Sequence, residues 1–386
     1  MRRTSGWLRT AGAAAVLGLV LTSIPADAGP PDAGRPGAGT AGAGTTVQTP
    51  VPEGVPATAV YAGSLSGRST GLWRQLPSGG IPRAAFENIR VLREYRNAAD
   101  RPLGEPTGEV VCAADKSVCR QQYGQEVVVW SSIGKARSLH ASVSDLSQRP
   151  DLAYLGLPVG SEYRSGDTFR TDFQHGSLIR VPKLGRIMTY DPRIAQSAVV
   201  VGDSQAGPDT WVGKGLSALG YTPVIRGAGG TGYVQGNGTV GSYPQALKRQ
   251  EWLLPWGDPR LVVLQGGGND AGATDAAIRD GALQMIREMR RTYPASRLIM
   301  VGVIAGGSTA GSARRVQMDA LLAGVAKAQN VEFLSIGDWW AKYSLGSYLQ
   351  PDGRHFTAAG HTNAGKVFAR ELGAALARPP KTVPAG

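Results

Sequence analysis

Apolar residues in the C-terminal half of the chain follow two alternating patterns. Runs of mostly apolar residues, typical of strands buried on both faces, occur at 198–201, 222–225, 261–264, 298–303 and 331–334. Apolar residues with helical period predict helices near 208–219, 243–254, 274–292, 312–328 and 358–376. Alternating strands and helices are typical of a parallel sheet covered on both faces. We therefore predict an α/β domain at 195–377.

Residues 57–191 have a different pattern and predict a small, mostly β module. Short runs rich in Val, Ile, Tyr and Trp, such as 126–130 and 177–181, are separated by Gly and Asp turns. The module repeats itself, because the Leu-Gly-Glu-Pro at 103–106 recurs 52 residues later as the Leu-Gly-Leu-Pro at 155–158.

The second copy of this repeat, at about 151–190, also contains Phe173-Gln174-His175-Gly176-Ser177 before a strand that ends near Gly185. These motifs resemble LGFP repeats, which occur in actinobacterial envelope proteins and are associated with attachment to the cell wall. The resemblance implies cell-wall glycan as a partner of the module. The first copy lacks the Phe-Gln-x-Gly-Ser core, and an inert module that only packs on its neighbour is the alternative.

The ends of the chain predict processing and disorder. Residues 1–28 have the parts of a signal peptide: Arg2 and Arg3, an apolar run at 11–21, and small residues at 26–28. This run is shorter than the ~20 residues that a membrane span requires, so we expect no stable membrane span. The segment 29–56 and the tail 378–386, both rich in Gly, Ala or Pro, predict disorder.

Composition and charge narrow the range of partners. The 42% of hydrophobic residues is enough for a sizeable core, and the net charge of +12 favours acidic partners. We expect no nucleic-acid partner, because the arginines are scattered rather than clustered with aromatic residues. An anionic cell envelope fits the charge better, and the expected location is secreted and associated with the envelope. In an exported protein, Cys112 and Cys119 are expected to form a disulfide, with two free thiols as the alternative.

The candidate catalytic residues follow the predicted strands of the C-terminal domain. The motifs are Gly-Asp-Ser-Gln at 202–205, a glycine-rich turn at 227–232, Gly-Gly-Gly-Asn-Asp at 266–270 and Asp-Gly-Arg-His at 352–355. The carboxyl ends of parallel strands meet at one edge of the sheet, which is where such sheets bind ligands. We therefore expect these four motifs to form one site.

Ser204 is the candidate nucleophile of this site. A serine hydroxyl needs a base to take its proton, and the base needs a third group to orient it, which are the roles predicted for His355 and Asp352. Donors for the developing oxyanion are the Ser204 N–H, an N–H in the Gly229-Gly230 turn and the Asn269 amide.

Together, in this order and at these strand ends, the four motifs resemble the four sequence blocks of SGNH (GDSL-like) hydrolases. The resemblance covers about 195–377 and implies a three-layer α/β/α sandwich with a five-stranded parallel sheet, esterase, lipase or deacetylase activity, and neither metal nor cofactor. The resemblance assigns the four roles after which the family is named to Ser204, Gly230, Asn269 and His355. Asp352 completes the triad. The supporting residues are Asp203, Gly229 and Asp270. The first block of the family often continues with Leu, whereas Gln205 follows the serine here.

Three alternatives accompany this interpretation. Residues 227–232 also fit the dinucleotide fingerprint Gly-x-Gly-x-x-Gly, but no helical pattern follows them. His361 could compete with His355 as the base, although its place inside the last helix favours packing or capping. Asn237-Gly238-Thr239 fits a glycosylation acceptor, which we set aside because the export signal looks bacterial.

The predicted function is that of a secreted serine esterase that hydrolyses carboxylic esters through an acyl-enzyme. Its expected substrates are acylated polysaccharides or lipid esters of the cell envelope. The alternative is a cell-wall-binding protein whose SGNH domain is an acyltransferase or an inactive scaffold.

Overall fold

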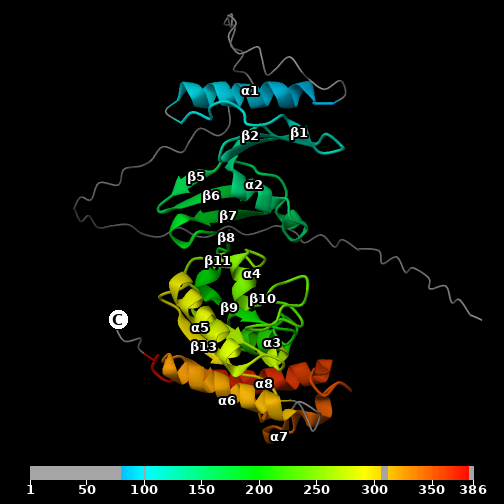
Figure 1. Cartoon of the computed structure of the whole chain (residues 1–386), viewed down its shortest axis with the longest axis vertical. Helices are drawn as coiled ribbons and strands as arrows, with labels where there is room; N and C mark the ends of the chain where they lie inside the picture. Colours follow the sequence, from blue (N-terminus) through cyan, green and yellow to red (C-terminus); the bar gives the residue numbers. More distant parts are fainter. Residues whose placement is uncertain (1–79, 100, 306–311, 382–386) are drawn as a thin grey trace, which may run out of the picture. The chain divides into compact units, whose positions relative to one another are not determined.

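The computed structural model describes residues 80–99, 101–305 and 312–381 (Figure 1). The predicted signal peptide 1–28 and linker 29–56 lie outside these residues, as do the start of the β-rich module and the end of the predicted tail. Arg378, at the start of that tail, forms an ion pair with Glu332 at 2.8 Å. Across the described ranges, no helix has both the length and the apolar character needed to cross a membrane.

A five-stranded parallel sheet forms the centre of the C-terminal domain. Its strands are β9 (Ser197–Gly202), β10 (Thr222–Gly227), β12 (Leu261–Gln265), β13 (Arg297–Val301) and β14 (Glu332–Leu334), in the spatial order β10-β9-β12-β13-β14. Every pairing in this sheet is parallel. The α/β fold class and the five predicted strands are therefore confirmed.

Helices connect these strands, and all but one short helix at 339–342 match the predicted helical segments. They are α3 (Trp211–Ala218), α4 (Tyr243–Lys248), α5 (Asp275–Thr292), α6 (Ser312–Ala328), the short α7 (Trp339–Lys342) and α8 (Ala358–Leu376). The helix predicted at 243–254 is too long, because it ends at Lys248 and Gln250 adopts a left-handed φ of 56°. The apolar residues that follow lead instead into the short strand β11 (Pro255–Trp256), which pairs with β8 (Arg186–Tyr190).

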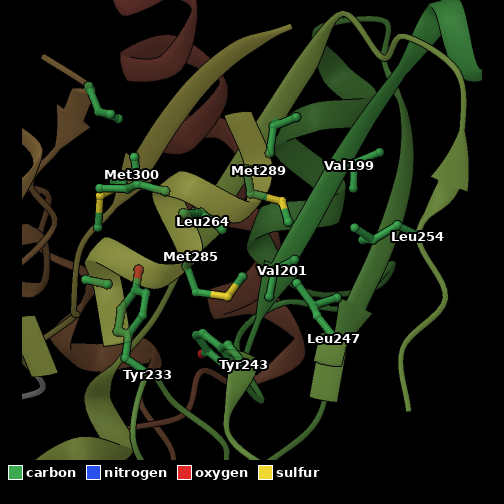
Figure 2. Packing of buried hydrophobic residues seen from close by; sticks show 14 of the residues in the cluster. Val199, Val201, Tyr233, Tyr243, Leu247, Leu254, Leu264, Met285, Met289 and Met300 are labelled. Atoms are coloured by element: carbon green, nitrogen blue, oxygen red, sulfur yellow. The ribbon is translucent and has the colours of Figure 1, made fainter. Parts of the chain in front are cut away.

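Side chains of β9 alternate between two separate apolar layers. Val199 and Val201 pack with Tyr243 and Leu247 of α4 and with the apolar faces of α5 and α6 (Figure 2). Ala198 and Val200 pack on the opposite face, with residues of α3, α7 and α8. Helices thus cover both faces of the sheet, which gives the predicted three-layer sandwich. A strand between two apolar layers needs apolar residues at every position, which explains the unbroken run at 198–201.

The N-terminal module contains two small antiparallel sheets and two helices that the sequence analysis missed. The first part has α1 (Arg83–Ala98), β1 (Val111–Cys112), β2 (Val118–Tyr123), β3 (Glu126–Ser131) and β4 (Arg137–His140). The second has α2 (Ala141–Ser147), the 3₁₀ turn Pro150–Leu155, β5 (Tyr163–Ser165), β6 (Thr168–Phe173), β7 (Gly176–Val181) and β8. Helix α1 buries Ala85, Ile89 and Leu92 at helical spacing along one face, which is the signal that could have predicted it.

These two parts repeat the same local structure. The hairpin of β6 and β7 begins 50 residues after that of β2 and β3, and all four strands have six residues. Leu103 and Leu155 are both buried, and the glycines that follow them have φ angles of 75° and 72°. The internal repeat that the sequence predicts is therefore a repeat of structure. Its relation to LGFP repeats stays a prediction.

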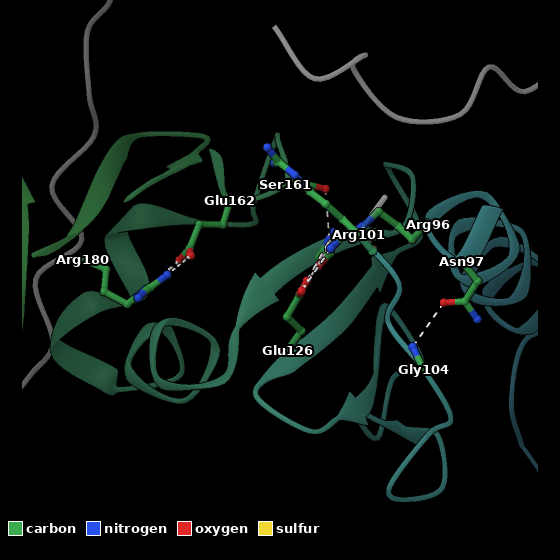
Figure 3. A network of polar contacts seen from close by, with 9 residues as sticks. Arg96, Asn97, Arg101, Gly104, Glu126, Ser161, Glu162 and Arg180 are labelled. Carbon is green, nitrogen blue, oxygen red and sulfur yellow. Dashed lines mark hydrogen bonds and ion pairs between the residues drawn. The ribbon is translucent and has the colours of Figure 1, made fainter. Parts of the chain in front are cut away.

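Polar contacts hold α1 against the first sheet (Figure 3). Arg96 forms an ion pair with Glu126 of β3 at 3.0 Å and donates to the carbonyl of Arg101 at 2.9 Å. The Asn97 side chain accepts the Gly104 N–H at 3.1 Å. A disulfide joins Cys112 and Cys119, which lie directly opposite each other in β1 and β2, so the predicted bond is present.

Candidate active site

Ser204, His355 and Asp352 meet beyond the carboxyl end of β9. Ser204 lies in the turn that follows this strand, and its Oγ is 2.8 Å from His355 Nε2. The other ring nitrogen of His355, Nδ1, is 2.6 Å from Asp352 Oδ2. The imidazole can therefore accept the serine proton while the carboxylate holds the ring by its second nitrogen.

The loop that carries His355 is organised around Asp352. Oδ1 of this carboxylate accepts the N–H groups of Arg354 at 2.9 Å and His355 at 3.0 Å. The hydrogen bond from the imidazole, followed by these two backbone donors, holds the pKa of Asp352 well below its usual range. The site is open to solvent, because the side chains of His355 and Asp352 are 39% and 44% exposed.

Asp203, next to the serine, is a buried carboxyl group rather than a solvent-exposed turn residue. It is 4% exposed, and its Oδ1 accepts the Gln205 N–H at 2.9 Å. This bond shapes the turn that presents Ser204. Burial raises the pKa of Asp203 from an ordinary value of 3.8 to about 6, although the Gln205 N–H and the positive charge of Arg315 act in the opposite direction.

The turn at Gly229 and Gly230 lies beside the serine, as predicted. A Cβ atom at Gly229 would lie 3.6 Å from the Ser204 Cβ, and Gly230 has a φ of 78°. The Gly229 carbonyl accepts a bond from the Asn237 amide at 2.9 Å. Because the peptide is trans, the Gly230 N–H points away from Asn237. Within the described residues, neither this N–H nor that of Ser204 donates a hydrogen bond, so both can serve an oxyanion.

Asn269 and Asp270 hold the same turn from the end of β12. The Asn269 Nδ2 donates to the Thr231 carbonyl at 2.9 Å, and its second N–H is available for a ligand. The Asp270 carboxylate accepts the N–H groups of residues 233, 234 and 235 at 2.7, 3.0 and 2.7 Å. Burial raises the pKa of Asp270, although these three donors oppose the effect. A Cβ atom at Gly232 would lie 2.4 Å from this carboxylate, so the position requires glycine.

Three residues of the site were missed by the sequence analysis. Asn237, considered only as a glycosylation acceptor, bonds to the Gly229 carbonyl and caps its own turn. Arg315 of α6 donates to the Gly268 carbonyl at 3.0 Å and to the Ile304 carbonyl at 2.8 Å, which fixes the segment before Asn269. Gln205 contacts the loop of His355 through its side chain. Asn237 had a local signal, because Asn-Gly is typical of tight turns, and Gln205 was visible as a departure from the first block of the family pattern.

The competing interpretations are resolved by the geometry. His361 caps a helix, because its Nδ1 accepts the Trp211 N–H at the start of α3 at 3.2 Å, so the capping role is confirmed. No helix directly follows Gly232, since α4 begins only at Tyr243, and the dinucleotide fingerprint lacks the helix it requires. Within the described ranges, no three His, Cys, Asp or Glu side chains are grouped so that they could hold a metal ion.

Comparisons with known proteins agree with this geometry. Residues 194–362 match the model of the GDSL-like Lipase/Acylhydrolase family. The C-terminal domain is therefore a serine esterase by class. More specifically, residues 194–362, less than half of the chain, are similar to GDSL-like hydrolases of the SGNH type. No curated protein matches the chain by sequence.

Several solved structures resemble part of the chain. An aryl esterase from M. smegmatis is 18% identical over 46% of this chain and 99% of its own, with a TM-score of 0.36. A carbohydrate acetylesterase from Sinorhizobium meliloti is 17% identical over 46% and 99%, with a TM-score of 0.35. A carbohydrate esterase of family 2 with a carbohydrate-binding domain, from Corynascus thermopiles, is 19% identical over 66% and 85%, with a TM-score of 0.37.

Asp203 generates a prediction about stability and pH. Its raised pKa means that the folded protein binds a proton more tightly than the unfolded chain, so stability falls as pH rises from about 4 to about 6. We expect Asp203→Asn, which keeps the acceptor for Gln205, to remove this fall, on the order of 2 to 3 kcal/mol. Urea unfolding at pH 4, 5, 6 and 7 measures it. The exposed Asp209→Asn serves as the control, and parallel pH curves for wild type and Asp203→Asn would contradict the prediction.

Proposed function

We propose that Ser204 is the nucleophile, His355 the general base and Asp352 the orienting carboxylate of an ester hydrolase. The observation that carries the proposal is the chain of contacts from Ser204 Oγ through the imidazole to Asp352, at 2.8 and 2.6 Å. Ser204 Oγ attacks the ester carbonyl while His355 Nε2 takes its proton. The same imidazole then protonates the leaving alcohol, and a water molecule activated by His355 releases the acyl group from Ser204.

The N–H groups of Ser204 and Gly230 and the amide of Asn269 are the proposed oxyanion donors. They come from three loops at one edge of the sheet, and two of them are backbone groups whose direction is fixed by the chain. Donors that are already oriented stabilise the tetrahedral intermediate without reorganisation, and each contributes about 3 kcal/mol in comparable enzymes. Asp270, Asn237 and Arg315 keep this arrangement rigid through the contacts described above.

Substitution of the triad tests the proposed chemistry. We expect Ser204→Ala and His355→Ala to lower kcat on 4-nitrophenyl acetate by about 10³-fold or more, because each removes a member of a unit that acts together. Ser217→Ala, an exposed serine on α3, is the control and should retain wild-type activity. Full activity in Ser204→Ala would exclude this serine as the nucleophile.

We propose carbohydrate O-acyl esters as the substrate class, in preference to lipid esters. The support is the exposure of His355 and Asp352, which leaves room for an ester on a bulky polymer. A long acyl chain, in contrast, needs a buried apolar channel to repay its transfer from water. Hydrolysis and acyl transfer share the same acyl-enzyme and differ only in the acceptor, so the transferase alternative uses the same residues.

The acyl length and the acceptor can be measured together. We expect kcat/KM to be at least about tenfold higher for 4-nitrophenyl acetate than for the octanoate, since an open site gains little from a longer chain. Acetylated xylan should release free acetate in proportion to ester loss. A preference for the octanoate would favour the lipid alternative, and ester loss without free acetate would favour a transferase.

We propose that the protein is exported and acts at the cell envelope, where the repeat module holds it to cell-wall glycan. The signal-like N-terminus and the net charge of +12 support export. The bond between Cys112 and Cys119 supports it too, because disulfides persist in oxidising compartments.

We expect the protein outside the cell to begin near Gly29 and to contain no free thiol. Mass spectrometry of the culture medium and of the washed envelope fraction tests this. A chain that keeps residues 1–28 and stays inside the cell would overturn the proposal.

A further inference from the structure

Among the hydrogen bonds of the described residues, two side-chain contacts join the nucleophile turn to the loop of His355. One is the triad contact of Ser204, and the other is made by Gln205. Its side chain is 3% exposed. Nε2 donates to the Arg354 carbonyl at 3.1 Å, and Oε1 accepts the Trp211 indole N–H at 3.0 Å. A buried amide with both ends bonded is held in one orientation.

Trp211 determines which way this amide faces. The indole nitrogen can only donate, so Oε1 must point towards Trp211 and the NH₂ group must point towards the Arg354 carbonyl. The indole itself has little freedom, because it is 1% exposed and packs edge-on against Phe368 and Trp339, with ring centroids 5.0 and 5.8 Å away. The core of the domain thus fixes the direction of the Gln205 NH₂ group.

The carbonyl that Gln205 binds belongs to the peptide group directly before His355. The N–H of the same peptide group donates to Asp352 Oδ1 at 3.0 Å. Both polar atoms of this peptide are therefore held, one by a buried side chain and one by the orienting carboxylate. The side chains of His355 and Asp352 are substantially exposed, so surrounding packing alone cannot fix the orientation of the imidazole. The anchored peptide group supplies this restraint.

We propose that Gln205 is a positioning residue that fixes the backbone of His355 so that the imidazole lies in line with Ser204. The proposal rests on the catalytic roles proposed above for Ser204 and His355. Leucine, which often occupies this place in the family pattern, cannot donate to the Arg354 carbonyl. The residue that departs from the pattern therefore has a specific structural task in this chain.

Two variants test the proposal. Gln205→Leu removes both bonds, and we expect kcat on 4-nitrophenyl acetate to fall about tenfold with KM changed less than about twofold, because misplacement of a catalytic group lowers the rate without changing substrate contacts. The matched control is Gln121→Leu. Gln121 is likewise buried, accepting the Tyr123 hydroxyl at 2.7 Å and donating to the Gly108 carbonyl at 3.2 Å, but it lies in the N-terminal module.

Gln205→Glu supplies a readout that a packing role would not produce. A protonated Glu can donate its O–H to the Arg354 carbonyl, whereas an ionised Glu places a second acceptor against it. We therefore expect the kcat of Gln205→Glu, divided by that of wild type, to fall on the order of tenfold between pH 5 and pH 9. If Gln205→Leu fails to fold, this pH profile decides the question alone.

The outcomes separate this proposal from the proposed function. Unchanged kcat in Gln205→Leu, a change confined to KM, or a constant ratio for Gln205→Glu would each overturn the positioning role. The rate at which a fluorophosphonate labels Ser204 gives the same comparison without any ester substrate. Wild type that is labelled but hydrolyses no ester contradicts the proposed function, while slower labelling of Gln205→Leu than of wild type and Gln121→Leu still supports the role of Gln205.

Discussion

Burial of β9 on both faces is the constraint on which the rest of the domain depends. The strand lies between β10 and β12 and is completely buried, so the apolar side chains at 198–201 each belong to one of two apolar layers. The strand ends at Gly202, and the turn that follows at its carboxyl end carries Ser204. The serine that the site requires is therefore placed by the hydrophobic packing of the residues before it.

The loops at this edge are held by hydrogen bonds rather than by regular structure. Asp270 accepts three consecutive backbone N–H groups, Asp352 accepts two, and Arg315 donates to two carbonyls from different loops. Buried or partly buried backbone groups would be costly without such partners. The same contacts that satisfy these groups orient the proposed oxyanion donors and the imidazole, so stability and the proposed chemistry depend on one set of residues.

The N-terminal module uses another means of stabilisation. Its two small sheets contribute to two buried apolar clusters, and a disulfide and ion pairs such as Arg96 with Glu126 and Arg180 with Glu162 add to this packing. Its second part also joins the core of the C-terminal domain, since Ile179, Val181 and Met188 belong to the same buried cluster as Val199 and Val201. Because the module shares a buried core with the enzyme domain, the two are packed together. The proposed attachment of the module to glycan would therefore also hold the enzyme domain there.

The sequence by itself determined the α/β class, the five strands, the positions of the main helices and the four motifs, because buried parallel strands and amphipathic helices leave periodic patterns in the local sequence. It missed α1, although the helical spacing of Ala85, Ile89 and Leu92 was present, and it missed the shorter α2. It also overextended the helix at 243–254, because the backbone turns at Gln250. Only the tertiary structure decided which groups meet across the chain. Gln205 and Arg354 are 149 residues apart, and Arg315 and Gly268 are 47 apart. Such contacts leave no periodic pattern in the local sequence, because they depend on where the sheet places separate loops.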